Sequence, residues 1–291
     1  MMTTRLCLPN ACRIDERSVD GIRVGLLTPE APKRSCIAVM GFGAWLDPFE
    51  YQRFALLAHR LEARITIVET PGLGAYRLRA SGGERRALLT GDYAPLARRM
   101  LHAGLAVAVP GGAEGVHLLG YSMGASLATD MAAAQLVPRL ASLTLVEPVG
   151  AQTWNPLVLI RAIRREDRLI DTYLQETATV RDAVAPSDRV PGAPGPFRSV
   201  LDQILLPQAL CWGRLGHQVG PIAQTGASLL VIHGTESQLS RPAAVDRLVQ
   251  RARRGGVTAT AVAVAGSHGI WQSLPRVAAI ADLLSAKWDG R

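Results

Sequence analysis

One short segment of this chain has the residue types and the spacing for nucleophilic chemistry. Residues 115–128 read GVHLLGYSMGASLA: an apolar run reaches GYSMG at residues 120–124 and continues as a small-residue helical pattern. A serine on a sharp strand-to-helix turn projects its hydroxyl away from the sheet, and the flanking glycines let the backbone pass closely. The dipole of the following helix and the N–H of Met123 would both favour negative charge nearby. The spacing therefore predicts that Ser122 is a nucleophile.

A serine nucleophile needs a general base, and histidine is the usual one. His268 lies in a Gly-Ser-His-Gly loop directly after residues 257–264, a β-branched run typical of a buried strand. From such a loop a base can approach a serine at another strand end. His233, at the end of an expected strand over 229–232, is the competing candidate. The remaining histidines fit less well: His59 and His102 on expected helices, His117 inside the strand before the serine, and His217 in a glycine-rich loop.

Strands that alternate with helices must position these residues. Further strands are expected over residues 21–28, 36–40 and 64–68, and helices over 49–61, 93–109 and 273–288. This alternation is typical of a parallel sheet whose functional residues gather at the carboxyl ends of the strands. The fold class predicted here is therefore α/β.

Residues 150–226 interrupt the alternation. A long helical pattern over 154–180 is followed by a segment rich in proline and glycine at 186–196 and by a short helical stretch at 199–212. We expect residues 1–149 and 227–291 to form the core domain and residues 150–226 to form a lid or cap. Such a lid would supply an apolar substrate pocket or, equally, use its large side chains only to hold itself on the core. The side chains considered for this pocket are Trp154, Leu157, Tyr173 and Trp212.

Four segments, taken in chain order, resemble the α/β-hydrolase superfamily over residues 20–285 or so. They are Gly41-Phe42-Gly43 after an apolar strand, the serine turn, VIHG at 231–234 and GSHG at 266–269. The resemblance implies a mostly parallel eight-stranded sheet flanked by helices, with a helical lid inserted after the sixth strand. It also implies that the N–H of Phe42 forms an oxyanion hole together with that of Met123. Met40 stands where relatives often carry histidine, but a backbone donor does not depend on that side chain.

The acid that would complete a Ser-His-acid triad departs from the family pattern. Many relatives place an aspartate three or four residues after the glycine of the seventh-strand turn, where this chain has Ser237 and Gln238. Glu236 lies one position earlier. Glu147, followed by Pro148 at the end of the expected sixth strand, matches the strand end from which some members take their acid. Glu147 is the preferred candidate and Glu236 the alternative, and either keeps the order Ser…Glu…His.

The expected activity is that of a serine hydrolase cleaving an apolar carboxylic ester through an acyl-enzyme, as carboxylesterases and lipases do. Thioesterase, lactonase or amidase chemistry would use the same residues. A non-catalytic binding protein of the same fold is the other hypothesis, because the family aspartate is missing. Neither cofactor nor metal is expected: Gly72-x-Gly74 lacks the third glycine of a dinucleotide fingerprint, since Arg77 stands there.

Composition and charge indicate which binding partners and which cellular location to expect. The 291 residues carry a formal net charge of +8, but the basic residues are spread along the chain without a nucleic-acid-binding signature, so no nucleic-acid partner is expected. Arginines near the site could still favour an anionic substrate. The four cysteines have no metal-ligand spacing, and no apolar run is long enough for a transmembrane helix. With no apolar signal segment near residue 1, a cytoplasmic location is expected.

Overall fold

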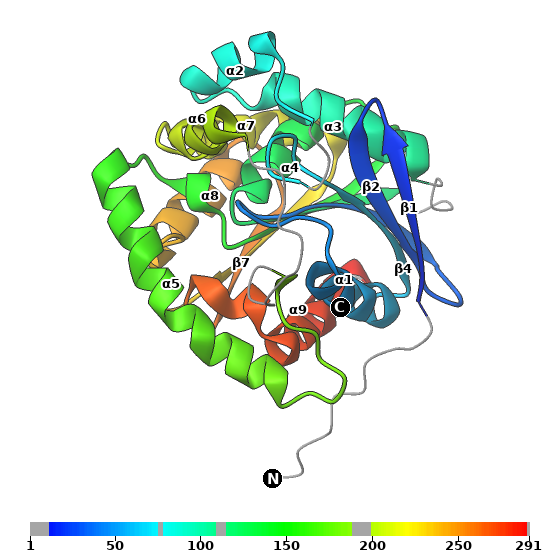
Figure 1. Ribbon diagram of the computed structural model, residues 1–291. Coiled ribbons are helices and arrows are strands. Elements are labelled where there is room, and N and C mark those ends of the chain that lie inside the picture. The colour runs from blue at the N-terminus through cyan, green and yellow to red at the C-terminus, as the bar shows by residue number, and fades with distance from the viewer. Residues whose placement is uncertain (1–11, 75–77, 109–114, 188–198, 290–291) are drawn as a thin grey trace.

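The strands form one eight-stranded sheet (Figure 1). The computed structural model describes residues 12–74, 78–108, 115–187 and 199–289. The strands are β1 (Arg13–Val19), β2 (Ile22–Thr28), β3 (Arg34–Val39), β4 (Ala63–Val68), β5 (Val116–Tyr121), β6 (Leu140–Val146), β7 (Ser228–Gly234) and β8 (Ala259–Val264). Their spatial order is β1-β2-β4-β3-β5-β6-β7-β8; β2 is antiparallel to β1 and β4, and every other pair is parallel. The predicted mostly parallel eight-stranded sheet is confirmed.

Helices cover both faces of the sheet. They are α1 (Pro48–Arg60), α2 (Gly82–Leu89), α3 (Ala94–Val107), α4 (Gly124–Ala133), α5 (Pro156–Ala178), α6 (Val200–Leu210), α7 (Leu215–Gln218), α8 (Pro242–Arg254) and α9 (Leu274–Trp288). One apolar core holds side chains of α3, α4 and α8, and a second, on the opposite face, holds side chains of α1 and α9. Because both faces are covered, β3 and β5 are buried almost throughout, as parallel strands usually are.

The strand expected over 257–264 was predicted to be buried, and this is corrected. The strand itself exists as β8, but most of its residues are half-buried or exposed. It is the last strand in the sheet and pairs only with β7. A β-branched run therefore indicated a strand without indicating its place in the sheet, since edge and central strands share the same propensity.

Among the elements that the sequence patterns missed, β1 and α2 carry a local signal. β1 and β2 form a hairpin through Asp20-Gly21, and both residues have positive φ, as a two-residue hairpin turn requires. The polar sequence of β1 hid it, since a strand at the sheet edge needs little apolar surface. α2 begins at a capping box in which the Ser81 side chain accepts from the Glu84 N–H and the Glu84 side chain accepts from the Ser81 N–H.

The segment between β6 and β7 contains α5, α6 and α7. α5 runs along one side of the molecule (Figure 1) and, like α6, lies where a helix was expected. His217, expected in a loop, lies in α7. Most of the proline- and glycine-rich segment, residues 188–196, lies outside the described residues, as do Cys7 and Arg77. The other three cysteines are free thiols. Among the described helices, none has the length and hydropathy needed to cross a membrane.

Candidate active site

Ser122 occupies the sharp turn between β5 and α4. Its φ is 57°, a left-handed conformation that a residue with a side chain adopts at a cost. The two glycines of the GYSMG segment are sterically required. A β-carbon at Gly120 would lie 2.4 Å from the carbonyl oxygen of Gly124, and one at Gly124 would lie 2.4 Å from that of Val39. The turn therefore holds Ser122 at the carboxyl edge of the sheet.

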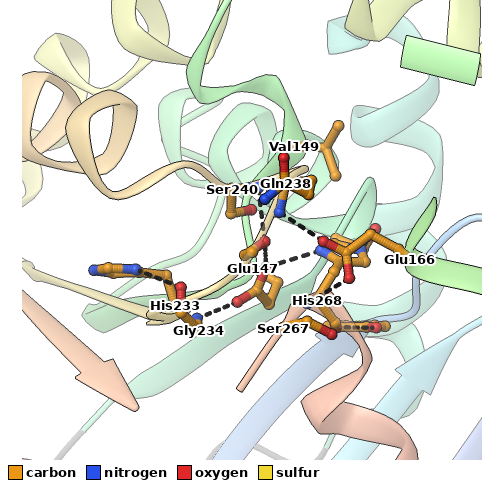
Figure 2. A network of polar contacts seen from close by, with 12 residues as sticks. Glu147, Val149, Glu166, His233, Gly234, Gln238, Ser240, Ser267 and His268 are labelled. Atoms are coloured by element: carbon orange, nitrogen blue, oxygen red, sulfur yellow. Dashed lines mark hydrogen bonds and ion pairs between the residues drawn. The ribbon is translucent and has the colours of Figure 1, made fainter. Parts of the chain in front are cut away.

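A chain of two hydrogen bonds links Ser122 to a histidine and a glutamate. The Ser122 Oγ lies 2.9 Å from Nε2 of His268, and Nδ1 of His268 lies 2.8 Å from Oε2 of Glu147. All three residues are buried, and Glu147 is fully so. Figure 2 shows Glu147 beside the imidazole ring. The structure thus brings together three residues that stand far apart in the sequence, in the geometry of a nucleophile, a base and its orienting acid.

Glu147, rather than Glu236, contacts the histidine. Glu147 follows β6 with φ 55°, and its carboxylate also accepts hydrogen bonds from the Gly234 N–H and, at 2.6 Å, from the Ser237 hydroxyl. Glu236 is exposed, and its backbone N–H donates to the Gly266 carbonyl. Ser237, at the position where many relatives were expected to carry the acid, therefore contacts Glu147 instead. These bonds fix the orientation of the Glu147 carboxylate.

The other histidines lie away from Ser122. His233 is buried in β7, with Nδ1 3.2 Å from the Gly234 carbonyl oxygen. His117 in β5 stacks on Trp288 and shares a 2.7 Å hydrogen bond with Ser142. Burial lowers the pKa of His117 to about 4, which keeps its ring neutral at ordinary pH. His59, His102 and His217 lie on α1, α3 and α7.

The loop after β3 lies beside the serine. β3 and β5 are adjacent and parallel with Val39 opposite Gly120, so their carboxyl ends meet. A β-carbon at Gly41 would lie 3.2 Å from the Ser122 β-carbon, and Phe42 lines the same cavity as Ser122. Among the described residues, none accepts a hydrogen bond from the backbone N–H of Phe42 or Met123. Both donors are thus free for an oxygen atom bound next to Ser122.

A second buried glutamate, Glu166 on α5, holds the loop of His268. Its Oε2 accepts from the His268 backbone N–H at 3.1 Å, and its Oε1 accepts from the Gln238 N–H at 2.6 Å (Figure 2). One carboxylate therefore joins α5 both to the loop that carries His268 and to the turn after β7 that contains Gln238.

Sequence reasoning missed Glu166 because residues 164–168 form a charged run typical of a solvated face. Helical spacing could have found it. The buried residues of α5 are Leu159, Ala162, Glu166, Tyr173 and Thr177, which follow one stripe of the helix. Glu166 is the charged member of that stripe.

We expect Glu166→Gln to lower kcat by about 10- to 100-fold with little change in KM. Glutamine keeps the shape of the side chain but turns an NH2 group towards one of the two backbone N–H groups, so one hydrogen bond is lost. The loop of His268 would then shift, and a displacement of about 1 Å at a reacting group lowers the rate. Steady-state kinetics on one ester checks this. Asp171→Asn is the matched control, because it removes the same charge from an exposed residue of α5 that does not line the cavity at Ser122. Equal losses in both variants would mean that charge, not the position of the loop, is responsible.

A cavity of about 460 Å³ opens at Ser122 and His268. Side chains of α5 form an apolar wall, among them Leu159, Ile163 and Ile170. Four acidic residues also line the cavity, whereas no lysine or arginine does so in the described part of the chain. The acidic residues are Asp47, Glu50, Glu166 and Asp167.

The four side chains expected to form the pocket do not line this cavity, and that expectation is corrected. Leu157 is 66% exposed on the outer face of α5, because the helix turns other residues inward. Tyr173 is buried, and its hydroxyl exchanges hydrogen bonds with Ser267 instead. Trp154 and Trp212 line a different cavity. The size and apolar character of these side chains did not indicate which face of the protein they occupy.

Two buried groups near the cavity have displaced pKa values. Burial raises the pKa of Glu50 to about 7, with Asp47 adding to the shift and the nearby Arg53 opposing it. Burial, and then the surrounding carboxylates, hold the pKa of Tyr121 well above its usual value. The Tyr121 hydroxyl therefore stays protonated and donates to the His268 carbonyl at 3.1 Å. The Tyr121 ring also stacks on the imidazole of His268, which further restrains that ring.

The described residues contain no cluster of histidine, cysteine and acidic side chains that could hold a metal ion.

Comparisons with known proteins agree with this fold. A family model described as the alpha/beta hydrolase family matches residues 41–282. The chain is similar to the thioesterase domain from the curacin biosynthetic pathway, with 18% identity, a TM-score of 0.58, and coverage of 94% of this chain and 99% of that one. It is also similar to carboxyl esterase 2 from the fungus Tuber melanosporum, with 12% identity, a TM-score of 0.58, and coverage of 98% of this chain and 88% of that one. A third similar structure is the haloalkane dehalogenase DatA from Agrobacterium tumefaciens C58, with 16% identity, a TM-score of 0.59, and coverage of 97% of this chain and 98% of that one. No curated protein matches the sequence. At these identities the structural likenesses show the fold alone.

Proposed function

Because this chain belongs to the alpha/beta hydrolase family, we propose that it is a serine hydrolase that cleaves a carboxylic ester through an acyl-enzyme. The observation that carries the proposal is the hydrogen-bonded chain from Ser122 through His268 to Glu147 at the end of a cavity. A serine hydroxyl can act as a nucleophile, an imidazole as a general base, and a carboxylate as the group that orients the imidazole. The carboxylesterase or lipase-like activity expected from the sequence remains the preferred one.

In the proposed reaction, Ser122 Oγ attacks the carbonyl carbon of the ester while its proton passes to Nε2 of His268. The carbonyl oxygen becomes an oxyanion and is bound by the N–H groups of Phe42 and Met123, each contributing about 3 kcal/mol. Collapse of this intermediate breaks the bond to the alcohol oxygen, which takes the proton from His268. Water, deprotonated by the same histidine, then attacks the acyl carbon and releases the acid and free Ser122. Glu147 orients the imidazole ring and stabilises its protonated form.

We propose that residues 150–226 form a cap on a core of residues 1–149 and 227–291. The contacts of α5 support a fixed wall rather than a hinged flap. The Tyr173 hydroxyl donates to Ser267 at 3.1 Å, the Thr177 hydroxyl donates to the Gln272 carbonyl at 2.7 Å, and Glu176 pairs with Arg276. These bonds join α5 to the segment that carries the proposed base. A movement of α5 would therefore displace His268.

The lining of the cavity favours a neutral or cationic substrate. Several carboxylates face the space beside apolar side chains, without a lysine or arginine in the described lining. An anionic acyl chain would meet like charge in a poorly solvated space. We therefore propose an apolar, uncharged or positively charged acyl group, and the suggestion that arginines near the site select an anionic substrate is withdrawn.

Glu50 makes this selectivity dependent on pH. Because its pKa is raised to about 7, Glu50 gains its negative charge as the pH rises through neutrality. The test compares two esters of equal length, one with a carboxylate on its acyl chain and one neutral. We expect the ratio of their KM values, carboxylate ester over neutral ester, to rise about three- to tenfold between about pH 6 and pH 8. Taking the ratio removes any effect of pH that the two esters share. In Glu50→Gln the ratio should stay flat; an unchanged rise would place the titrating group elsewhere.

Labelling with a fluorophosphonate probe tests the proposed function. The probe phosphonylates a serine only where a base and oxyanion donors activate it, so folded protein should be labelled at Ser122 and heat-denatured protein should not. Mass spectrometry of the digested adduct identifies the serine. Failure of the folded protein to react would favour the non-catalytic binding protein instead. A panel of esters, thioesters, lactones and amides would then separate the activities that share these residues.

A further inference from the structure

A second cavity, of about 480 Å³, lies outside the proposed active site. It is formed by residues 151–155 after β6, Val158 of α5, the turn that follows α6, α7 and one face of α8. It shares no lining residue with the cavity at Ser122. The proposed reaction therefore leaves this cavity without a role.

The charge of this cavity is the opposite of that at Ser122. Arg241, Arg247, Arg251 and His217 line it, and no acidic residue does so in the described part of the chain. None of the three arginines forms an ion pair with an acidic residue that the structure describes. Arg247 and Arg251 are one turn apart on α8 and so lie on the same side of the helix, where like charges repel. An anion between them would remove that repulsion.

The arginine side chains are directed into the cavity by close packing. Gly216 of α7 approaches α8 so closely that a β-carbon there would lie 2.9 Å from Nη1 of Arg251. Arg241 precedes α8, and its guanidinium lies 5.5 Å from the ring centre of Trp154. The Trp154 indole is itself fixed, because its N–H donates to the Val149 carbonyl at 2.9 Å. Planar guanidinium groups held in this way match the oxygens of a phosphate in pairs.

Trp212 adds a flat apolar surface to the same cavity. Its side chain is 50% exposed, which is unusual for the largest apolar residue type. A ring or a lipid chain attached to a phosphate could lie against it. We propose that this cavity binds a phosphate ester or pyrophosphate group, with the arginines on the phosphate oxygens and Trp212 against the adjoining apolar or aromatic part.

Calorimetric titration with inorganic pyrophosphate tests the proposal, using the full chain at low salt because screening weakens such contacts. We expect binding by the wild type, and a Kd raised at least about tenfold in Arg247→Gln/Arg251→Gln. Arg161→Gln/Arg165→Gln is the matched control: it removes the same charge from two exposed arginines one turn apart on α5 that do not line the cavity. The control should change Kd less than about twofold. Ser122→Ala should bind as the wild type does, so this result is independent of the proposed hydrolase activity.

Two further arms identify the source of the phosphate. Tighter binding of ADP than of pyrophosphate, lost in Trp212→Ala, would support a nucleotide-type ligand. Sedimentation with phosphatidylglycerol vesicles, lost in the α8 double variant but not in the α5 control, would support a lipid headgroup. Absence of pyrophosphate binding up to about 1 mM, or equal weakening in both double variants, would overturn the proposal and leave only non-specific attraction by net charge.

Discussion

Ser122→Ala is expected to lower kcat by about 10⁴-fold or more on any ester that the wild type accepts. The substitution removes the oxygen that forms the acyl-enzyme, and neither His268 nor Glu147 can replace it. The fold should survive, since alanine fits the same turn and both residues bear the same cost at φ 57°. Hydrolysis of a chromogenic ester, followed with circular dichroism and thermal unfolding on the same samples, measures both outcomes.

Ser126→Ala is the matched control for this variant. Ser126 lies on α4 one turn after Ser122, is also buried, and does not line the cavity. Its activity should stay within about threefold of the wild type, as expected for a substitution away from the reacting atoms. A Ser122→Ala enzyme with turnover close to that of the wild type would remove Ser122 from the mechanism.

Glu147→Gln is expected to approach the same loss, about 10⁴-fold in kcat, whereas Glu236→Gln should stay within about tenfold of the wild type. Glutamine keeps the size of the side chain but cannot stabilise a protonated His268. Its NH2 group would also face a hydrogen-bond donor in place of the acceptor now present. Glu236 is exposed, so its substitution should leave the imidazole in place.

Because Glu147 is fully buried, its variant needs a test that separates chemistry from folding. Thermal unfolding measures any loss of stability. In a folded Glu147→Gln protein, adding Ser122→Ala should cause little further loss, since residues that act as one unit are far from additive. A severe loss in Glu236→Gln with a mild one in Glu147→Gln would move the acid to the turn after β7. Two mild losses would mean that neither glutamate assists His268.

Much of this protein could be predicted from local sequence. The strand, turn and helix around Ser122 follow from apolar residues, two glycines and small helical residues that are adjacent in the chain. The parallel sheet followed from the alternation of strands and helices, and His268 from its place after the last strand. These features depend on neighbouring residues, which is the range over which propensity and periodicity act. The hairpin at Asp20-Gly21 and the capping box at Ser81 were equally local and could have been predicted.

The choice between Glu147 and Glu236 depended on the tertiary structure. Both follow a strand, but only the packing of β6 against β7 directs one carboxylate towards His268, while the other faces solvent. The residue type alone could not show which of the two glutamates contacts His268, because both follow a strand closely. Ser237 illustrates the same point, since its contact with Glu147 joins residues from two strand ends.

The walls of both cavities were also decided by the tertiary structure. A helix pattern indicates which residues share a face but not which face meets the site. Leu157 was expected in the pocket and lies on the outer face of α5, whereas Glu166, which was not considered for the site, is buried. The arginines of the second cavity all lie within residues 241–251, but they meet His217 and Trp154 only where α7 and residues 151–155 pack beside α8. The sequence by itself determined the class of fold and the strand, turn and helix around Ser122, because these follow from patterns within contiguous segments. Which glutamate contacts His268, and which side chains line the cavity at Ser122, were decided by long-range packing, because each depends on contacts between segments that lie far apart in the sequence.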